Sequence, residues 1–150
     1  MLNNNRIKLG IFSTNTSSGI TAVKVPERWE ASWDNNLEIA RKADAAGIEC
    51  MIPVARWRGY GGETNFNRSS FETLTWATGL LAVTEKITIF GTVHVPLIHP
   101  IFAAKQLVTA DHVGKGRMAL NIVAGWNFDE FAMFGEAPLE HDARYDYAQE

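Results

Sequence analysis

The fold is decided by the stretch Asn121-Ile-Val-Ala-Gly-Trp-Asn-Phe-Asp-Glu-Phe131, which continues a predicted strand that starts at residue 117. A strand here carries an amide near its carboxyl end, at Asn121, and passes through Gly125 into a loop with acidic and aromatic side chains. In parallel α/β proteins, ligands bind at the carboxyl ends of the strands. We therefore expect Asn121 to face a ligand and Glu130 to lie on the segment that closes over it.

The same strand, residues 117–123, also indicates the kind of sheet. Large apolar side chains (Met118, Leu120, Ile122) alternate with small or polar ones (Ala119, Asn121, Val123). Because successive strand residues point to opposite faces, the first set should pack on helices and the second should face a narrower, partly polar interior. This pattern favours a barrel over a doubly wound open sheet, whose strands are usually apolar on both faces.

The remaining elements alternate in the same way along the chain. Short apolar runs predict strands at residues 7–12, 49–54 and 86–92, and helical spacing after Pro26, with Gly47 as the cap, predicts the first helix. Further helices are expected at 70–83, from Pro100 to 113, and from 142 to 150, and a connecting loop at 94–99. Four strands alternating with helices predict parallel pairing in the order 1-2-3-4 with right-handed crossovers.

Length limits how much of a barrel these elements can form. The chain has 150 residues, 46% of them hydrophobic, which suits one globular domain. A complete (β/α)8 barrel needs roughly 250 residues. We therefore expect either the front half of a longer, truncated protein or a small open-sheet domain complete in itself.

Charge and cysteine content exclude several classes of function. The net charge is −3, and the 14 Lys and Arg residues are scattered, so no nucleic-acid or anionic-membrane surface is expected. Cys50 is the single cysteine and is interpreted as a small buried hydrophobe. The first six residues do not resemble a signal peptide, and no apolar run reaches the ~18 residues of a membrane span. A cytoplasmic protein is the expectation.

Two groups of residues are candidate ligand sites. The loop 56–62 is rich in glycine and could bring backbone amides and the Arg56 side chain to a ligand, although a surface loop packed by Trp57 and Tyr60 is the alternative. Its glycine spacing matches neither a phosphate loop nor a dinucleotide-binding turn. The four histidines lack metal-ligand spacing, so no metal is expected, but His94 follows a strand and is placed to face a ligand.

The amide and the terminal helix suggest further ligand contacts. An Asn in an apolar strand needs a polar partner, which for Asn121 is either a ligand or a group of the protein or water. Arg144 and Tyr145 stand near the start of the last helix, where free backbone amides and the helix dipole favour an anion such as phosphate.

Taken together, these segments resemble the bacterial luciferase-like flavin-dependent monooxygenases. Two motifs are similar to the dimethyl sulfone branch, Asn121-Ile-Val-Ala-Gly-Trp126 with Leu139-Glu-His-Asp-Ala-Arg-Tyr145, and Ala103-Ala-Lys-Gln-Leu107 agrees with them. The loop Arg58-Gly-Tyr-Gly-Gly62, with Thr64 and Phe66, is more similar to the pyrimidine branch. The resemblance extends from Ile7 to the end of the chain.

The resemblance implies a (β/α)8 TIM barrel, of which this chain holds the first four βα units as a single domain, 1–150. It implies reduced FMN, supplied by a separate NAD(P)H-dependent flavin reductase. That FMN reacts with O2 to give a flavin peroxide or hydroperoxide and oxidises a small sulfone, sulfonate or pyrimidine. It implies a homo-oligomer when full length, and a non-proline cis peptide at Gly91–Thr92. The resemblance leaves the catalytic residues unassigned. The cofactor contacts that it implies are Ala55, Arg56, Gly91, Thr92, Asn121, Glu130, Arg144 and Tyr145.

Two alternatives to a working monooxygenase stay open on the sequence. One is a non-catalytic remnant or small flavin-binding domain. The other is an open-sheet nucleotide-binding domain unrelated to luciferases.

Overall fold

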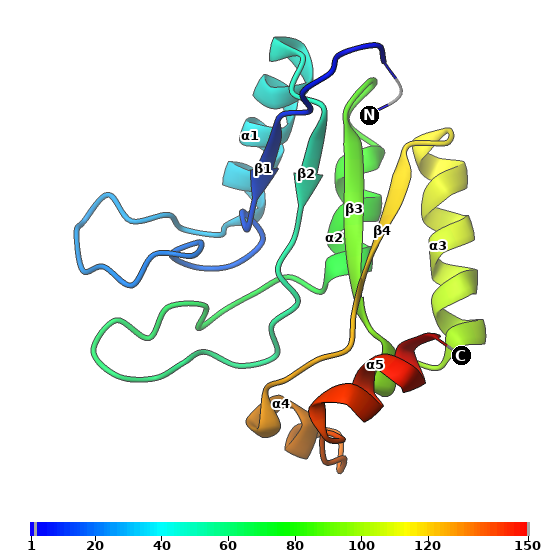
Figure 1. The fold of residues 1–150 in the computed structure, drawn as a ribbon. Coiled ribbons are helices and arrows are strands. Elements are labelled where there is room, and N and C mark those ends of the chain that lie inside the picture. The colour runs from blue at the N-terminus through cyan, green and yellow to red at the C-terminus, as the bar shows by residue number, and fades with distance from the viewer. Residues whose placement is uncertain (2, 150) are drawn as a thin grey trace.

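The computed structural model describes residues 1 and 3–149 and contains one four-stranded sheet with helices packed on one of its faces (Figure 1). The strands pair in the order β1-β2-β3-β4, and every pairing is parallel. The predicted strand order and direction are therefore confirmed. In chain order the elements are β1 (Gly10–Phe12), α1 (Trp33–Ala46), β2 (Cys50–Ile52), α2 (Thr73–Leu81), β3 (Thr88–His94), η1 (Val95–Leu97), α3 (Pro100–Gly114), β4 (Met118–Val123), α4 (Phe128–Met133) and α5 (His141–Gln149).

Several helix ends lie where the sequence predicts them. Gly47, with φ of 80°, ends α1, and its N–H group donates to the carbonyl groups of Ala43 and Asp44. Pro100 occupies the first turn of α3, where its missing N–H group leaves no helical hydrogen bond unmade. The last predicted helix is present as α5, although its predicted end at residue 150 lies outside the described residues.

Other boundaries differ from the prediction for local reasons. Helix α1 begins at Trp33 rather than just after Pro26, because the hydroxyl group of Ser32 accepts from the N–H group of Asn35 and caps the helix there. The indole N–H group of Trp29 instead donates to the carbonyl oxygen of Thr14. Strand β3 extends to His94, so the expected loop at 94–99 begins as strand and continues as the turn η1. Helix α4 has no counterpart among the predicted elements.

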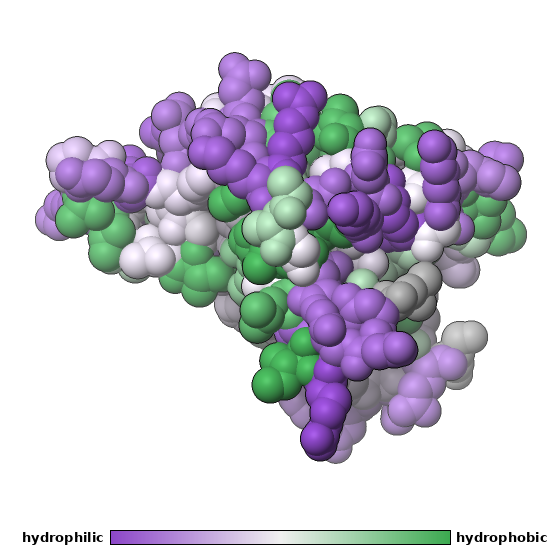
Figure 2. Space-filling model, turned by 90° about the horizontal axis from the view of Figure 1, so that it is seen from above, coloured by the Kyte–Doolittle hydropathy of each residue, from purple (hydrophilic) through white to green (hydrophobic). Residues whose placement is uncertain are grey.

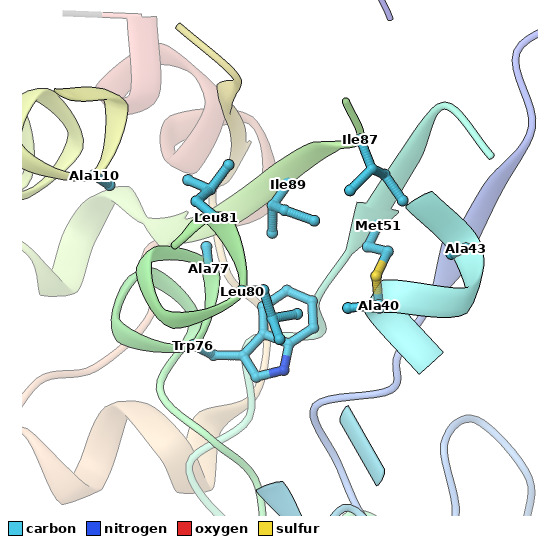
Figure 3. Packing of buried hydrophobic residues seen from close by; sticks show 10 residues of the cluster. All are labelled: Ala40, Ala43, Met51, Trp76, Ala77, Leu80, Leu81, Ile87, Ile89 and Ala110. Carbon is cyan, nitrogen blue, oxygen red and sulfur yellow. The ribbon is translucent and has the colours of Figure 1, made fainter. Parts of the chain in front are cut away.

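The hydrophobic core fills the space between the sheet and its helices (Figure 3). Met51 of β2 and Ile89 of β3 are fully buried against α1 and α2. The largest core side chain is Trp76 of α2, whose indole Nε1 donates to Oδ1 of Asn36 across 2.8 Å. This buried polar contact ties α2 to α1.

Strand β4 shows the predicted alternation of faces. Met118 packs against the helix-side core, and Leu120 and Ile122 lie beside α3 on the same side, so this part of the prediction is confirmed. Because β4 is the last strand of the sheet, Leu120 and Ile122 remain 39% and 58% exposed. Asn121 lies on the opposite, inner face, next to Thr92 of β3.

The carboxyl ends of all four strands point toward the same edge, at the bottom of Figure 1, where the long loops, α4 and α5 gather. Seen from the other end, hydrophilic side chains cover most of the surface, with hydrophobic ones between them (Figure 2). No helix among the described residues has the length and apolar character that a membrane crossing requires.

The Trp76–Asn36 contact yields a stability prediction. We expect Asn36→Ala to lower the free energy of unfolding by about 2 to 3 kcal/mol, because it leaves the buried indole N–H group without an acceptor. Urea unfolding measures the change. Arg41→Ala, an exposed position on the same helix, is the control and should leave the midpoint close to wild type. Equal midpoints for wild type and Asn36→Ala would show that the contact contributes nothing.

Candidate functional site

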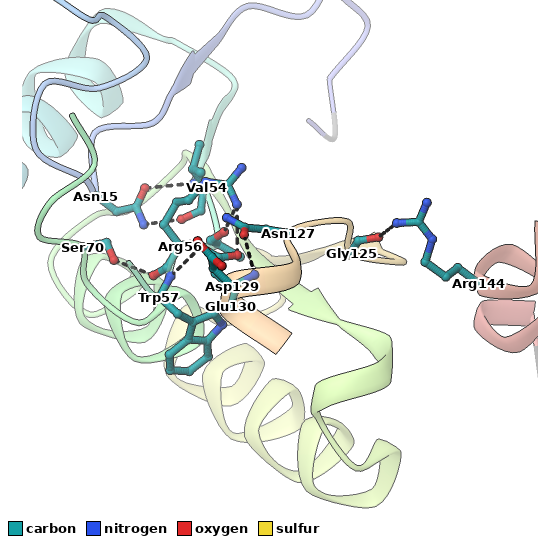
Figure 4. A network of polar contacts seen from close by, with 11 residues as sticks. Asn15, Val54, Arg56, Trp57, Ser70, Gly125, Asn127, Asp129, Glu130 and Arg144 are labelled. Atoms are coloured by element: carbon teal, nitrogen blue, oxygen red, sulfur yellow. Dashed lines mark hydrogen bonds and ion pairs between the residues drawn. The ribbon is translucent and has the colours of Figure 1, made fainter. Parts of the chain in front are cut away.

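A buried side-chain amide joins the loops at the carboxyl edge, which is the edge of the sheet where the carboxyl ends of the four strands lie. The side chain of Asn15, which is fully buried, donates from Nδ2 to the carbonyl oxygens of Val54 and Phe71 at 2.8 and 3.2 Å. Its Oδ1 accepts from the N–H group of Val54 at 2.9 Å. Asn15 therefore holds the loop after β1 against both ends of the loop between β2 and α2 (Figure 4). Sequence reasoning missed this residue, and its only signal is a polar side chain shortly after a strand.

A buried ion pair connects the loop after β2 to α4. Nη1 of Arg56 lies 3.2 Å from Oε2 of Glu130, and these side chains are 11% and 2% exposed. The second carboxylate oxygen of Glu130 accepts from the N–H group of Trp57 at 3.0 Å. Both residues are predicted site residues, and the structure brings them together (Figure 4).

Aromatic rings and a hydroxyl group complete the surroundings of Arg56. Its guanidinium carbon lies 5.3 Å from the ring centre of Tyr60 and 5.2 Å from that of Trp126, distances typical of cation–π contacts. The hydroxyl group of Ser70 donates to its carbonyl oxygen at 2.6 Å. Nε of Arg56 is buried and has no acceptor among the described residues, so one donor remains available at this position.

On the inner face of the sheet, Thr92 and Asn121 are direct partners across β3 and β4. Nδ2 of Asn121 donates to Oγ1 of Thr92 at 3.1 Å, and the Thr92 hydroxyl donates to the carbonyl oxygen of Pro53 at 2.9 Å. This chain of hydrogen bonds orients the Asn121 amide toward the interior, where a ligand could meet it.

Gly91 lies on the other face of β3, against the helices. A Cβ atom at this position would lie 2.2 Å from Cδ2 of Leu74 and 2.7 Å from Cε of Met118. Glycine therefore allows Leu74 of α2 and Met118 of β4 to pack closely against β3, and a larger residue would have to displace their side chains. The expected cis peptide at Gly91–Thr92 is wrong: no cis peptide bond occurs among the described residues, and both residues continue the regular ladder between β3 and β4.

His94 ends β3 beside the ion pair. It is 8% exposed, and its ring nitrogens take part in no hydrogen bond of the described residues. Burial lowers the pKa of His94 below its ordinary value, nearby Arg56 lowers it further, and Glu130 opposes these effects. The imidazole is thus held in its neutral form at neutral pH.

Arg144 and Tyr145 take different positions on α5. Nη1 of Arg144 donates to the carbonyl oxygen of Gly125 at 2.5 Å and so ties α5 to the turn after β4. Its Nε is buried without a partner among the described residues. Tyr145 is 55% exposed, with its ring 5.1 Å from that of His141. The structure places Arg144 at the carboxyl edge, whereas the Tyr145 side chain makes no hydrogen bond to the other predicted site residues that the structure describes.

A cavity of about 260 Å³ opens between the ends of β2 and β3 and the starts of α2 and α3. Its walls include the predicted residues Ala55, Arg56 and Thr92, and also His94. Within residues 1 and 3–149, no three His, Cys, Asp or Glu side chains gather as metal ligands. The carboxyl edge therefore offers a mostly apolar cavity with a few fixed polar groups, which is the usual composition of a small-molecule site.

Comparison with known proteins identifies what this arrangement resembles. Residues 7–150 match the family model described as luciferase-like monooxygenase. Among curated proteins, the chain is 33% identical over 146 residues to pyrimidine monooxygenase RutA of Caulobacter segnis. It is 35% identical over 145 residues to the FMNH2-dependent dimethylsulfone monooxygenase of Pseudomonas putida. These alignments cover 96% of this chain but 42% and 39% of the relatives, so the chain spans about two fifths of their length.

Solved structures share the fold. EDTA monooxygenase (EmoA) from Chelativorans sp. BNC1 superposes with a TM-score of 0.80 at 19% identity, covering 97% of this chain and 36% of that one. Riboflavin lyase (RcaE), solved with modified FMN and riboflavin, superposes with a TM-score of 0.82 at 23% identity and the same coverage. The four βα units therefore have the α/β fold of the corresponding part of these larger proteins.

The ion pair yields a prediction with a control on the same helix. Glu130→Ala leaves the buried Arg56 charge unpaired, and we expect it to cost about 3 to 5 kcal/mol of the free energy of unfolding. Asp129→Ala removes an exposed partner of Arg58 and should leave the stability near wild type. Urea unfolding of both variants measures the difference. Equal, small losses in the two variants would contradict the buried pair.

The lowered pKa of His94 yields a pH prediction. As the pH falls below about 6.5, the unfolded chain binds a proton at this position before the folded protein does. Stability from this group is therefore present above that pH and is lost as the pH falls through the folded-state pKa. Unfolding free energies at about pH 7.5 and about pH 5.5 should differ less in His94→Phe than in wild type. His112→Phe, at an exposed histidine, should keep the wild-type difference. If the unfolding free energy of His94→Phe changes between the two pH values as much as that of the wild type, then His94 is not the source of the pH dependence.

Proposed function

The chain belongs to the luciferase-like monooxygenase family, and on that premise we propose that residues 1–150 form the N-terminal half of an FMN-dependent monooxygenase barrel. The observation that carries the proposal is the convergence of Arg56, Thr92, Asn121 and Glu130 at the carboxyl edge of a parallel sheet. The relative from Pseudomonas putida is named as FMNH2-dependent, which supports the choice of flavin.

The residues present fit a flavin. Two buried arginine donors, Nε of Arg56 and Nε of Arg144, have no acceptor among the described residues, and a bound anion or carbonyl oxygen would supply one. Asn121 presents an amide on the inner face, and an amide can both donate to and accept from a heterocycle or a hydroxyl group. These donors and acceptors match a ligand that combines a polar ring, a hydroxylated chain and a phosphate group.

We assign the cofactor contacts by this chemistry. Asn121 and Thr92 would hold polar atoms of the flavin on the inner face, and the backbone from Ala55 to Arg56 and at Gly91 would lie alongside. Arg144 would meet the phosphate group, with Tyr145 as the second contact. Glu130 would act mainly through Arg56, since its two carboxylate oxygens already bind Arg56 and the N–H group of Trp57.

When bound, reduced FMN would supply the two electrons that activate O2, so that one oxygen atom of O2 enters a small organic substrate and the other leaves as water. The protein would contribute orientation and exclusion of water. The Arg56–Glu130 pair would fix the segment after β4 over the carboxyl edge, and the apolar side chains there would keep water out. We propose a separate NAD(P)H-dependent reductase as the source of reduced flavin and a homo-oligomeric assembly. The substrate would be a small organic molecule of the sulfone, sulfonate or pyrimidine type.

The assignment of Arg144 can be tested by comparing two flavins. FMN and riboflavin share the ring and ribityl chain, and only FMN carries a phosphate group. We expect the purified protein to bind FMN, and Arg144→Ala to weaken FMN about tenfold or more while changing riboflavin little, because charge-assisted hydrogen bonds to phosphate are lost. Fluorescence titration at fixed ionic strength measures both affinities.

Arg41→Ala, on the surface of α1, is the matched control and should change neither affinity. An equal loss for both flavins in Arg144→Ala would place this arginine away from the phosphate. No binding of either flavin by the wild-type protein would contradict the proposed function.

A further inference from the structure

The cavity at the ends of β2 and β3 is too small for the whole cofactor. Its volume of about 260 Å³ lies just below the roughly 300 to 1,000 Å³ of pockets that bury drug-sized ligands. Most of its wall is apolar and comes from α2, α3, the end of β3 and the adjoining loops, with Phe71, Leu74, Ile98 and Phe102 among its apolar residues. It therefore suits a compact organic molecule.

The charged side chains around this cavity do not favour an anion, because one pair is neutral overall and the remaining charge is negative. The positive charge of Arg56 is balanced by Glu130 at 3.2 Å, so the pair is neutral as a unit. The other charged side chain in the wall is Glu72, whose carboxylate is exposed at the rim and accepts from the N–H groups of Leu74 and Thr75. An anionic ligand would have to leave water for an apolar cavity that offers no unbalanced positive charge, which is unfavourable.

Side chains of the wall with hydrogen-bonding atoms left free among the described residues include the His94 imidazole, the Gln106 amide and Nε of Arg56. His94 is the one of these three that is both buried and uncharged. The carbonyl oxygen of Thr92 already accepts from the Thr73 hydroxyl, and the Thr92 hydroxyl is bound to Pro53. The His94 imidazole takes part in no hydrogen bond of the described residues and is neutral. A neutral imidazole has one N–H donor and one acceptor nitrogen, so it can bind a carbonyl or sulfonyl oxygen.

We propose that this cavity binds a small uncharged organic molecule through a carbonyl or sulfonyl oxygen that accepts a hydrogen bond from His94. The inference rests on the proposed function, because this molecule would be the substrate of the monooxygenase. It narrows the substrate class to neutral compounds and excludes sulfonates. It also assigns His94 as a substrate-contacting residue.

Two probes of nearly equal size separate neutral from anionic ligands. Dimethyl sulfone and methanesulfonate both present sulfonyl oxygens to a donor, and only the second is charged. Titration of the purified protein, followed by the NMR signals of the His94 ring, should give a saturable shift with dimethyl sulfone. Methanesulfonate should bind at least about tenfold more weakly, which corresponds to about 1.4 kcal/mol.

Variants test the role of His94 in the same titration. His94→Phe keeps an aromatic ring and removes both nitrogens, and it should weaken dimethyl sulfone about fivefold, as expected for the loss of one hydrogen bond. Shifts of methyl signals from Leu74 and Ile98 in the wall report binding in this variant. His112→Phe, at the exposed end of α3, should leave the affinity unchanged. The comparison of the two probes on wild-type protein does not depend on how well either variant folds.

The outcomes separate this inference from the proposed function. Equal or tighter binding of methanesulfonate, or unchanged binding in His94→Phe, overturns the inference. FMN binding without sulfone binding overturns the cavity assignment and leaves the flavin proposal standing. Sulfone binding without FMN binding supports the cavity assignment and contradicts the flavin proposal.

Discussion

The buried ion pair between Arg56 and Glu130 is the interaction on which the carboxyl edge of this sheet depends. It joins the loop that follows β2 to the helix that follows β4, two segments that do not adjoin in the sheet. Because a buried charge without its partner is costly, the two segments must stay together for either charge to stay buried. Trp57, Trp126 and the cavity wall all adjoin this contact: the N–H group of Trp57 donates to Glu130, the Trp126 ring lies against Arg56, and Arg56 lines the cavity.

A second constraint acts within the sheet itself. Parallel strands bring their carboxyl ends to one edge, and the register of β3 and β4 sets Thr92 directly beside Asn121. Tight packing at Gly91 brings β3 close to α2 on one face, which leaves the polar pair on the other. The fold therefore separates a helix-side core that supplies stability from an inner face and edge that carry polar groups for ligands.

The sequence predicts the elements with strong local signals and misses those that depend on distant contacts. Gly47, Pro100 and the alternation along β4 act locally, so the helix ends, the strand order and the inward face of Asn121 could be predicted. Helix α4 is only six residues long and is capped by Asn127, too short for a helical apolar pattern.

The geometry of the site also depends on contacts between residues that are far apart in the sequence. The partners Arg56 and Glu130 are 74 residues apart, and no spacing in the sequence pairs them. The same holds for Asn15, which joins two loops. The expectation of a cis peptide at Gly91–Thr92 came from the resemblance alone and is wrong for this chain. Local chemistry could identify Arg56, Asn121 and Glu130 as candidate site residues. It could not show that Glu130 binds Arg56.

The most direct test of the central claim is a crystal structure of the protein grown with FMN. We expect electron density for the flavin ring at the carboxyl ends of β3 and β4, within hydrogen-bonding distance of the Asn121 amide, with the phosphate group next to Arg144. Flavin density elsewhere on the molecule, with the inner face beside Thr92 and Asn121 left to solvent, would contradict it.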